Sequence, residues 1–244
     1  MSGVTYELHL HSCLSPCGDA EMTPSSIAGM AMLNGVRIAA LTDHNTCQNC
    51  PAFFEACYNY GVVPVPGMEL TTAEEIHMVC LFDSLDVAMD FDRFIAARRI
   101  KVKNKPEIFG EQLIMNADDE VIGSEKDLLI LATDLDLTTA VRIVKQFGGA
   151  ALPAHIDKQS NGMIGVLGSF PEEPGFRAAE FRDASKIESY RKLYPQLVDM
   201  MTVTNSDAHS LEQMFLKPHV LSALNDDVNG EELRRALISI LRGD

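Results

Sequence analysis

Histidine and acidic residues recur along this chain in short motifs that are able to bind metal ions. The positions that share this character are His9, His11, Asp43, His44, Glu69, His77, His155, Asp207 and His209. Imidazole and carboxylate ligands together suit Zn, Mn or Fe, whereas Ca is held by oxygen ligands alone and a structural Zn site is rich in cysteine. The residue types therefore indicate a site for transition-metal ions.

The spacing of the motifs supports a shared site. His9 and His11 are two residues apart, and side chains at that spacing on a strand project from the same face, so two imidazoles can hold one ion. Asp207 and His209 repeat the spacing. A carboxylate such as Glu69 is able to bridge two cations, which an imidazole does not do. Each motif alone is weak evidence, but their repetition favours a metal cluster.

The elements that must position these residues are short apolar strands. Five of the seven histidines fall at or just past the C-terminal end of a predicted strand, and His77 falls inside one. Strands are predicted at Val4 to Leu10, Val36 to Leu41, Val62 to Gly67, Ile76 to Phe82, Gly149 to Pro153, Ala178 to Phe181, Met201 to Asn205 and Val220 to Ala223. In α/β barrels and open α/β sheets, sites are built at this end of the strands.

Helical patterns alternate with these strands. Helices are predicted from about Pro24 to Asn34, Pro51 to Tyr60, Asp86 to Arg98, Thr138 to Phe147 and Gly230 to Leu241. The alternation predicts an α/β fold with parallel strands, as a barrel of about seven strands or, alternatively, an open doubly wound sheet. We expect residues 1–244 to form a single domain, with an insertion or cap at residues 99–135 and a hairpin at Gln112 to Ile122.

Composition limits the classes of partner. No apolar run approaches the roughly 20 residues that span a bilayer, and no secretory signal is visible, so we expect a cytoplasmic protein that does not bind membranes. The formal net charge of −15 argues against a broad footprint for duplex nucleic acid. It does not exclude an anionic substrate, because bound cations can make a local pocket positive.

Six cysteines lie in the first 80 residues. Cys13 and Cys17 follow one predicted strand, and Cys47 and Cys50 follow the next, so a four-cysteine zinc site is an alternative metal site. Reduced thiols are the favoured interpretation for a cytosolic chain of this size.

The motifs, in their order along the chain, resemble the polymerase and histidinol phosphatase (PHP) superfamily. The runs that carry the resemblance are Glu7-Leu8-His9-Leu10-His11-Ser12, Leu41-Thr42-Asp43-His44-Asn45, Pro66-Gly67-Met68-Glu69, Ile76-His77, Pro153-Ala154-His155 and Asn205-Ser206-Asp207-Ala208-His209. They extend over most of the sequence. The resemblance is specific for the superfamily and not for a substrate.

The resemblance implies a distorted seven-stranded (β/α) barrel that holds two or three divalent ions. The first ion would be held by His9, His11, Glu69 and Asp207. Glu69 would bridge to a second ion held also by His77 and His155. The third ion would be held by Asp19, His44 and His209. The lengthened segment Cys13 to Gly18 makes Glu21 an alternative to Asp19, and Ile156 stands where the family often has proline.

The resemblance implies a metal-dependent hydrolase of phosphoric esters that uses a metal-bound hydroxide. We expect Asp43 to orient a ligand, and His44 or His209 to protonate the leaving oxygen if it is not metal-bound. The expected substrate is a phosphorylated small molecule, a nucleotide or an oligonucleotide end. Lys158 and Arg177 are either phosphate contacts or solvated charges.

Two other functions use the same motifs. One is a catalytically weak binding module that metal ions stabilise, and the other is a metallohydrolase of a non-phosphate bond. The oligomeric state has no signal in the sequence.

Overall fold

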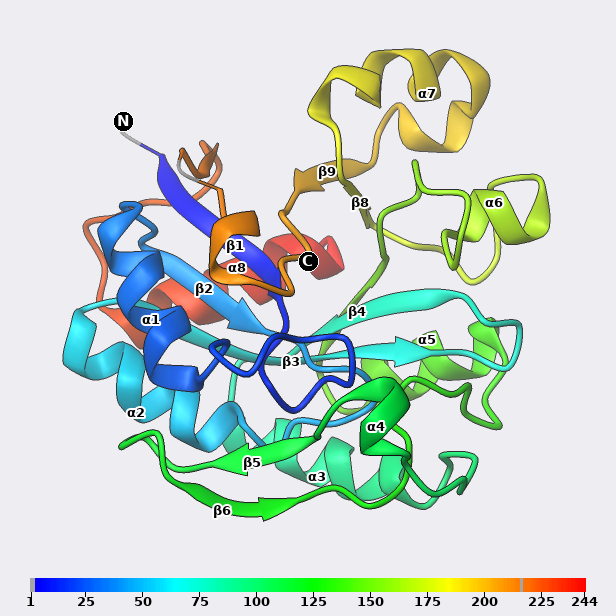
Figure 1. Ribbon diagram of the computed structural model, residues 1–244. Coiled ribbons are helices and arrows are strands. Elements are labelled where there is room, and N and C mark those ends of the chain that lie inside the picture. Colours follow the sequence, from blue (N-terminus) through cyan, green and yellow to red (C-terminus); the bar gives the residue numbers. More distant parts are fainter. Residues whose placement is uncertain (1–2, 216) are drawn as a thin grey trace.

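The computed structural model describes residues 3–215 and 217–244, and its centre is a curled, six-stranded mixed sheet (Figure 1). The strand order is β10-β1-β2-β3-β4-β7. The strands of this sheet are β1 (Val4–Leu10), β2 (Ile38–Leu41), β3 (Val63–Thr71), β4 (His77–Leu81), β7 (Ala150–Pro153) and β10 (His219–Leu221). The predicted α/β fold is confirmed, with a sheet that curls into part of a barrel.

The pairing of the strands is parallel only in part. β1, β2 and β3 are parallel, as predicted, because a helix connects each to the next. β4 runs antiparallel to β3, with Thr71 paired to His77, because a connection of residues 72–76 is too short for a parallel crossover. β7 and β10 also pair antiparallel with their neighbours. The expectation of parallel strands was therefore wrong at β4, β7 and β10.

Helices cover the sheet, and their ends follow local sequence signals. The helices are α1 (Pro24–Leu33), α2 (Cys50–Tyr60), α3 (Leu85–Ala96), α4 (Pro106–Phe109), α5 (Leu137–Gln146), α6 (Met163–Leu167), α7 (Ile187–Leu193) and α8 (Gly230–Arg242). Thr23 caps α1 by accepting from the amide of Ser26, and Asn229 forms a capping box with Glu232 on α8. All of these helices except the short α4, α6 and α7 lie where the sequence predicts helices.

The core consists of two hydrophobic clusters. The larger joins the sheet to α1, α2, α3 and α5, and includes the fully buried Phe53, Phe82 and Phe91. The other joins the sheet to α8 through Leu233, Leu237 and Leu241. No helix among the described residues is long and apolar enough to cross a membrane.

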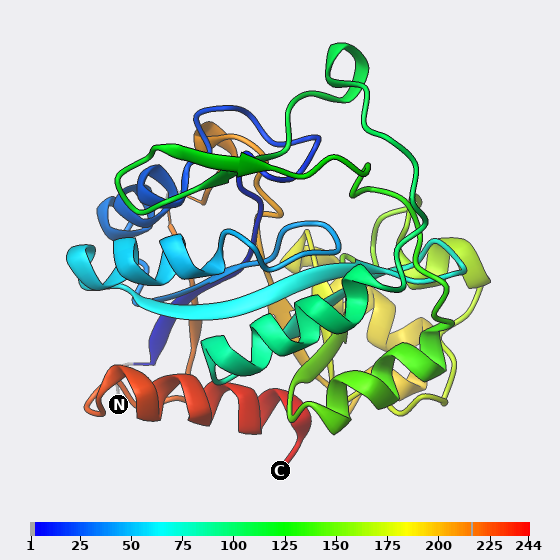
Figure 2. The same cartoon turned by 90° about the horizontal axis from the view of Figure 1, so that it is seen from below.

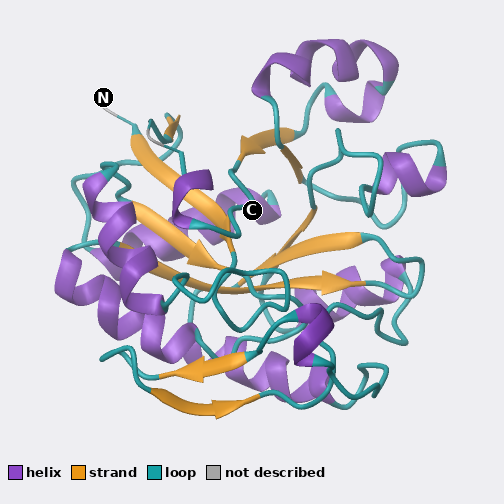
Figure 3. Cartoon of the chain, in the orientation of Figure 1, coloured by secondary structure: helices purple, strands orange, loops and turns teal. Residues whose placement is uncertain are grey.

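A second sheet completes the wall around the centre. β8 (Ala178–Phe181) and β9 (Met201–Thr204) pair in parallel and lie beside α6 and α7 (Figure 3). The junctions with the large sheet contain few backbone hydrogen bonds, among them Ile156 N to Glu180 O at 2.9 Å. Buried side chains add to them: the amide of Leu8 donates to Asn205 Oδ1, and that of Thr204 donates to Tyr6 Oη.

The segment between α3 and α5 lies over the loop that follows β1 (Figure 2). It contains α4 and the antiparallel hairpin of β5 (Leu113–Met115) and β6 (Val121–Ser124), located where the sequence predicts a hairpin. The amide of Leu113 donates to Cys13 O at 3.1 Å. Asn45 donates to Leu129 O and Leu131 O and accepts from the amide of Thr71. This segment is therefore attached directly to the chain beside His44.

Candidate metal centre

Three groups of ligand atoms converge where β1, β2, β3 and β9 end. Within each group the ligand atoms lie within 4.8 Å of one another. Among the described residues, the groups are His9, His11, Glu69 and Asp207; His44, Glu69 and His77; and His11, His44 and His209. The groups share members, so the geometry suits a cluster of ions.

Glu69 is at the centre of the cluster and is almost fully buried. Its Oε1 lies 3.3 Å from His9 Nε2, 2.8 Å from His77 Nδ1 and 3.1 Å from His155 Nε2. Its Oε2 lies 3.2 Å from His11 Nε2 and 3.0 Å from His44 Nδ1. One carboxylate thus faces five imidazoles, the arrangement expected of a ligand that bridges ions.

His9 and His11 present two lone pairs to each other. The Nδ1 of His9 donates to the Glu180 carboxylate at 2.9 Å. The Nδ1 of His11 donates to Ser15 Oγ at 3.0 Å, and that hydroxyl donates to Asp43 Oδ1 at 2.7 Å. Each ring therefore has a proton on Nδ1, and in the neutral rings the Nε2 atoms, 3.1 Å apart, present lone pairs to each other. A metal ion held by both nitrogens, or a proton on one of them, would remove this repulsion.

Unpartnered polar atoms support the same conclusion. Within the described part of the chain, His44 Nδ1, Glu69 Oε2 and His155 Nδ1 are buried without a hydrogen bond. His44 Nδ1 and Glu69 Oε2 are close enough to interact, but the angles are not those of a hydrogen bond. Leaving buried polar atoms unsatisfied costs about 1–3 kcal/mol each. Ion binding at His44 and Glu69 would explain why these atoms converge.

The backbone is strained at two of the candidate ligands. His155 has a φ of 30° and Asp207 a φ of 47°, in the left-handed region that residues other than glycine seldom adopt. Such conformations cost about 1–3 kcal/mol and are concentrated at functional sites. The fold therefore holds these two side chains at a cost in stability.

The electrostatics suit cations. Burial alone would lower the pKa of His11, but Asp207 and Glu69 raise it to about 9. Burial alone would raise the pKa of Glu69, but the histidines around it keep it well below its usual range. Burial, with His11 nearby, lowers the pKa of His209 to about 3, so its imidazole is neutral near pH 7 and able to ligate.

The structure brings together most of the predicted ligands. The four residues expected around the first ion form one compact group. His155 contacts Glu69 without joining any of the groups, and His44 takes a place beside Glu69 and His77. Asp19 is exposed, and its carboxylate is in none of the groups, although its amide donates to His209 O.

Asp43 is connected to the candidate ligands through serine side chains. Its carboxylate accepts from the amide and hydroxyl of Ser12 and from the hydroxyl of Ser15. Ser15 in turn holds His11 and accepts from the amide of His44. Asp43 is thus placed to orient His11 through Ser15.

Glu180 is a further residue of the site, and none of the sequence motifs indicates it. Its carboxylate is fully buried and accepts from His9 Nδ1, from the amide of His155 and from Asn205 Nδ2. The available signal was an acidic residue inside the apolar strand Ala178–Phe181. Arg177, by contrast, packs near Gly243 and does not line the hollow beside the cluster.

The cysteines do not form a competing site in the described structure. All six are free thiols, and none belongs to a converging ligand group. Cys17 is exposed, while the others are buried. Burial raises the pKa of Cys13 to about 12, which keeps the thiol protonated. The four-cysteine zinc alternative therefore has no support in the geometry.

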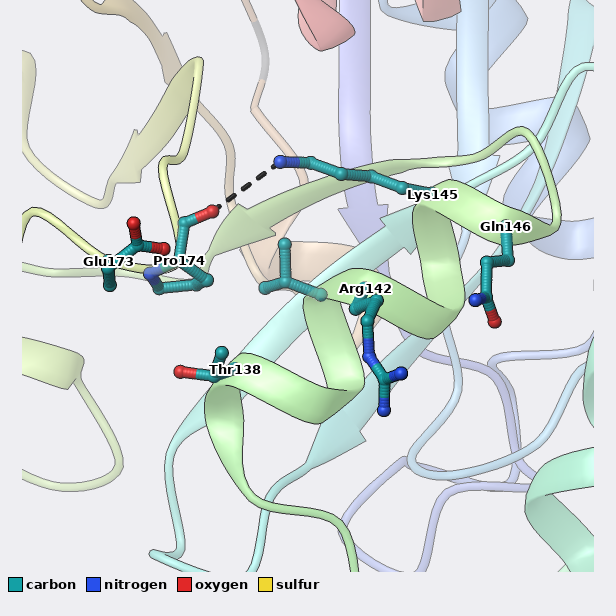
Figure 4. A pocket seen from close by; sticks show the side chains of 7 residues that line it. Thr138, Arg142, Lys145, Gln146, Glu173 and Pro174 are labelled. Atoms are coloured by element: carbon teal, nitrogen blue, oxygen red, sulfur yellow. Dashed lines mark hydrogen bonds between the residues drawn. The ribbon is translucent and has the colours of Figure 1, made fainter.

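Two hollows differ in their relation to the cluster. One, of about 500 Å³, is lined by Asp207 and His209 together with basic side chains. The other, of about 430 Å³, lies along α5 and is lined by Thr138, Arg142 and the Glu173-Pro174 loop (Figure 4). Its lining holds no histidine or cysteine, and Lys145 donates there to Pro174 O. Only the first of these two hollows adjoins the candidate ligands.

Comparison with known proteins agrees with this geometry. The 5'-3' exoribonuclease Rnm of Salmonella typhimurium is 29% identical over 164 residues, which are 64% of this chain and 53% of Rnm. The chain thus spans about half the length of that relative. A lesion-specific endonuclease, EndoQ from Pyrococcus furiosus, has a TM-score of 0.63 and 17% identity, over 98% of this chain and 56% of EndoQ.

Other solved structures share the fold. A protein of Bifidobacterium adolescentis assigned as a metal-dependent phosphoesterase has a TM-score of 0.60 and 16% identity, over 96% of each chain. Endonuclease Q has also been solved with a 27-mer duplex. The fold therefore does not exclude duplex nucleic acid as a partner. The expectation that this chain lacks a duplex footprint rests on its net charge alone. Because the PHP domain family matches residues 7–146, more than half of the sequence, this chain belongs to that family, as its motifs predict.

Proposed function

We propose that this protein is a metal-dependent hydrolase of phosphoric esters. The observation that carries the proposal is the pair of facing Nε2 atoms of His9 and His11, 3.1 Å apart and close to Glu69 and Asp207. Such an arrangement of imidazoles and carboxylates suits a metal ion, which would take the place of the proton that the raised pKa of His11 otherwise retains. Membership of the PHP family also supports phosphoester hydrolysis as the reaction.

The residues present fit two or three ions of Zn, Mn or Fe. His9, His11, Glu69 and Asp207 would hold one ion, and the remaining candidate ligands are Glu69 again, with His44, His77, His155 and His209. Divalent ions held there would supply an activated water for attack and neutralise charge on the phosphoryl oxygens.

The protein's own residues prepare this site in three ways. Glu180 holds His9, and Ser15 holds His11, each in the tautomer that leaves Nε2 free. Burial of Glu69 keeps bulk water from the centre of the cluster. His209 is partly exposed where it lines the hollow beside the cluster, and its low pKa favours the role of metal ligand over that of proton donor.

We also propose that residues 99–135 act as a cap of a single domain. The hydrogen bonds from Asn45 attach this segment beside His44, so it is placed to shape access to the cluster. The six free thiols agree with a reducing compartment, and we place the protein in the cytoplasm.

Nucleic acid ends are candidate substrates as well as small molecules. Rnm is an exoribonuclease and EndoQ an endonuclease, and both cleave phosphoesters of nucleic acids. Phosphorylated small molecules and nucleotides require only the cluster and a pocket beside it. The proposal therefore covers monoesters and diesters.

The test is metal content by elemental analysis, together with hydrolysis of a panel of phosphomono- and diesters. The variant is His9→Ala/Asp207→Ala, and the matched control is His219→Ala/Asp227→Ala, which removes the same residue types outside the ligand groups. We expect two or three equivalents of metal and activity in wild type and control, and neither in the variant. One equivalent of Zn that survives the mutation, or no hydrolysis by metal-loaded wild type, would contradict the proposal.

A further inference from the structure

Basic side chains gather around the hollow that adjoins the metal centre. Lys158 follows β7, while Arg182 and Lys186 follow β8, and all three line the hollow together with Asp207 and His209. The chain carries 20 lysines and arginines against 35 acidic residues. The carboxylates of Asp157, Asp183 and Asp207 line the same hollow, so its three cations are available to an anion only where other partners balance these carboxylates.

Asp207 is shared between the metal centre and this hollow. Its Oδ1 lies 3.5 Å from His9 Nε2 and 3.3 Å from His11 Nε2. Its Oδ2 faces the other way, 3.1 Å from Lys158 Nζ and 3.7 Å from Arg182 Nη1. The hollow and the cluster are therefore in direct contact through a single carboxylate.

The two cations beside Asp207 are accessible. The side chains of Lys158 and Arg182 are 44% and 36% exposed. When Asp207 serves as a metal ligand, its charge is balanced by the ion, and the two cations lose most of their counter-charge. They are then available to a phosphate group at the cluster.

Lys186 lies farther from the reacting centre. Its Nζ is 3.3 Å from Asp157 Oδ2, and its side chain is 46% exposed. Asp157 also accepts from the amides of Arg182 and Asp183, which fixes the chain after β8. The charge of Asp157 is thus divided among several donors, so Lys186 remains able to bind a second anionic group.

We infer that this hollow binds a second phosphate of the substrate, one that is not hydrolysed. Lys158 and Arg182 would face the phosphate at the cluster, and Lys186 the phosphate beyond it. Two sources supply this chemistry: a small molecule with two phosphates, and the next phosphodiester of an oligonucleotide. The inference rests on the proposed function, because it assigns the first phosphate to the metal centre.

The experiment compares Lys186→Ala with Lys192→Ala in the metal-loaded protein. Lys192 is an exposed lysine on α7 outside the hollow, so the control removes the same charge from the same region. Calorimetry measures binding of butylphosphonate and of butane-1,4-diphosphonate, which are not hydrolysed. Turnover is measured with butyl phosphate against 1,4-butanediol bisphosphate, and with a 5′-mononucleotide against a 5′-phosphorylated dinucleotide.

We expect wild type and Lys192→Ala to bind the diphosphonate about tenfold more tightly than the monophosphonate, as one charge-assisted hydrogen bond allows. Lys186→Ala should lose most of this preference. The turnover pair with the larger preference identifies the source of the second phosphate. A preference that is absent in wild type, or unchanged in Lys186→Ala, would overturn the inference. Preserved binding preference without hydrolysis of any ester would refute the proposed function and support the anion site.

Discussion

Glu180 decides which nitrogen of His9 faces the metal centre. Three donors converge on this buried carboxylate: His9 Nδ1, the amide of His155 and Asn205 Nδ2. A carboxylate has acceptor sites for all of them, and its charge strengthens each bond. This fully buried acid is thus placed to orient His9, one of the candidate ligands.

Glu180→Gln should weaken metal binding about 10- to 100-fold, the usual effect of changing a group that orients a ligand. Glutamine has one acceptor oxygen, and its amide would face a donor. Chelator competition for Mn or Zn measures the affinity. Glu188→Gln removes the same charge from an exposed position on α7 and should leave metal affinity unchanged. Equal affinities in the two variants would show that Glu180 does not orient His9.

Protons compete with ions for the same nitrogens. Burial alone would lower the pKa of His44, but Glu69 raises it to about 9, and His11 is raised to about 9 as well. Below that pH both rings carry a proton that must leave before an ion binds. We expect metal affinity to be greater at pH 8 than at pH 6, with proton release at pH 7. Calorimetry in buffers of different ionisation enthalpy measures the release, and a heat independent of buffer would contradict it.

At the scale of elements, the loop after β2 joins the cluster to the segment above it. Asn45 follows His44 directly, has a φ of 52°, and donates to two carbonyl groups of residues 129 and 131. A small rearrangement of this asparagine is therefore expected to affect both His44, a candidate ligand, and the proposed cap at residues 99–135. The amides of Leu129 and Thr133 are hydrogen-bonded in the same region.

Asn45→Gly should loosen the cap without straining the backbone, because glycine tolerates the positive φ. The loss of its side-chain hydrogen bonds should lower the free energy of unfolding by about 2 kcal/mol. Hydrogen exchange at the amides of Leu129 and Thr133 should become faster. The control Asn161→Gly also has a positive φ, and its side chain bonds to Glu75 instead of the cap. Unchanged exchange in Asn45→Gly would mean that other contacts hold the cap.

The sequence predicted most of the candidate ligands because they lie next to strand ends, where short apolar runs are easy to recognise. It did not predict how Glu180 is used, because its partner His9 is 171 residues away and no local pattern connects them. The antiparallel direction of β4 depends on the length of one turn. The position of Asp19 depends on how the segment Cys13 to Gly18 folds, which periodicity does not describe.

At the scale of the whole molecule, the cluster joins the two sheets. His9 and His11 belong to β1 and the turn after it, in the large sheet, while Asp207 follows β9 of the smaller sheet. An ion bound by all three therefore stabilises the arrangement of the sheets as well as the site. Folding and metal binding are coupled in such proteins.

Metal removal should lower the melting temperature. Ions at 100 times their Kd stabilise the folded state by about 2.7 kcal/mol, which corresponds to about 5–10 °C in a protein of this size. Thermal unfolding with excess Mn and with EDTA measures the difference. The double variant His9→Ala/Asp207→Ala should show no difference, and a wild-type protein insensitive to EDTA would argue against coupling.

The junction between the two sheets affects how metal ions enter the cluster from solvent. The sheets are separate hydrogen-bonded units, and near the cluster side chains such as Tyr6 and Asn205 connect them. The junction can therefore open while both ladders stay intact, at a free energy well below that of global unfolding. We expect ions to reach buried candidate ligands such as His9 through this sub-global opening. The rate of metal uptake should therefore follow the rate at which the junction opens and not the rate of global unfolding.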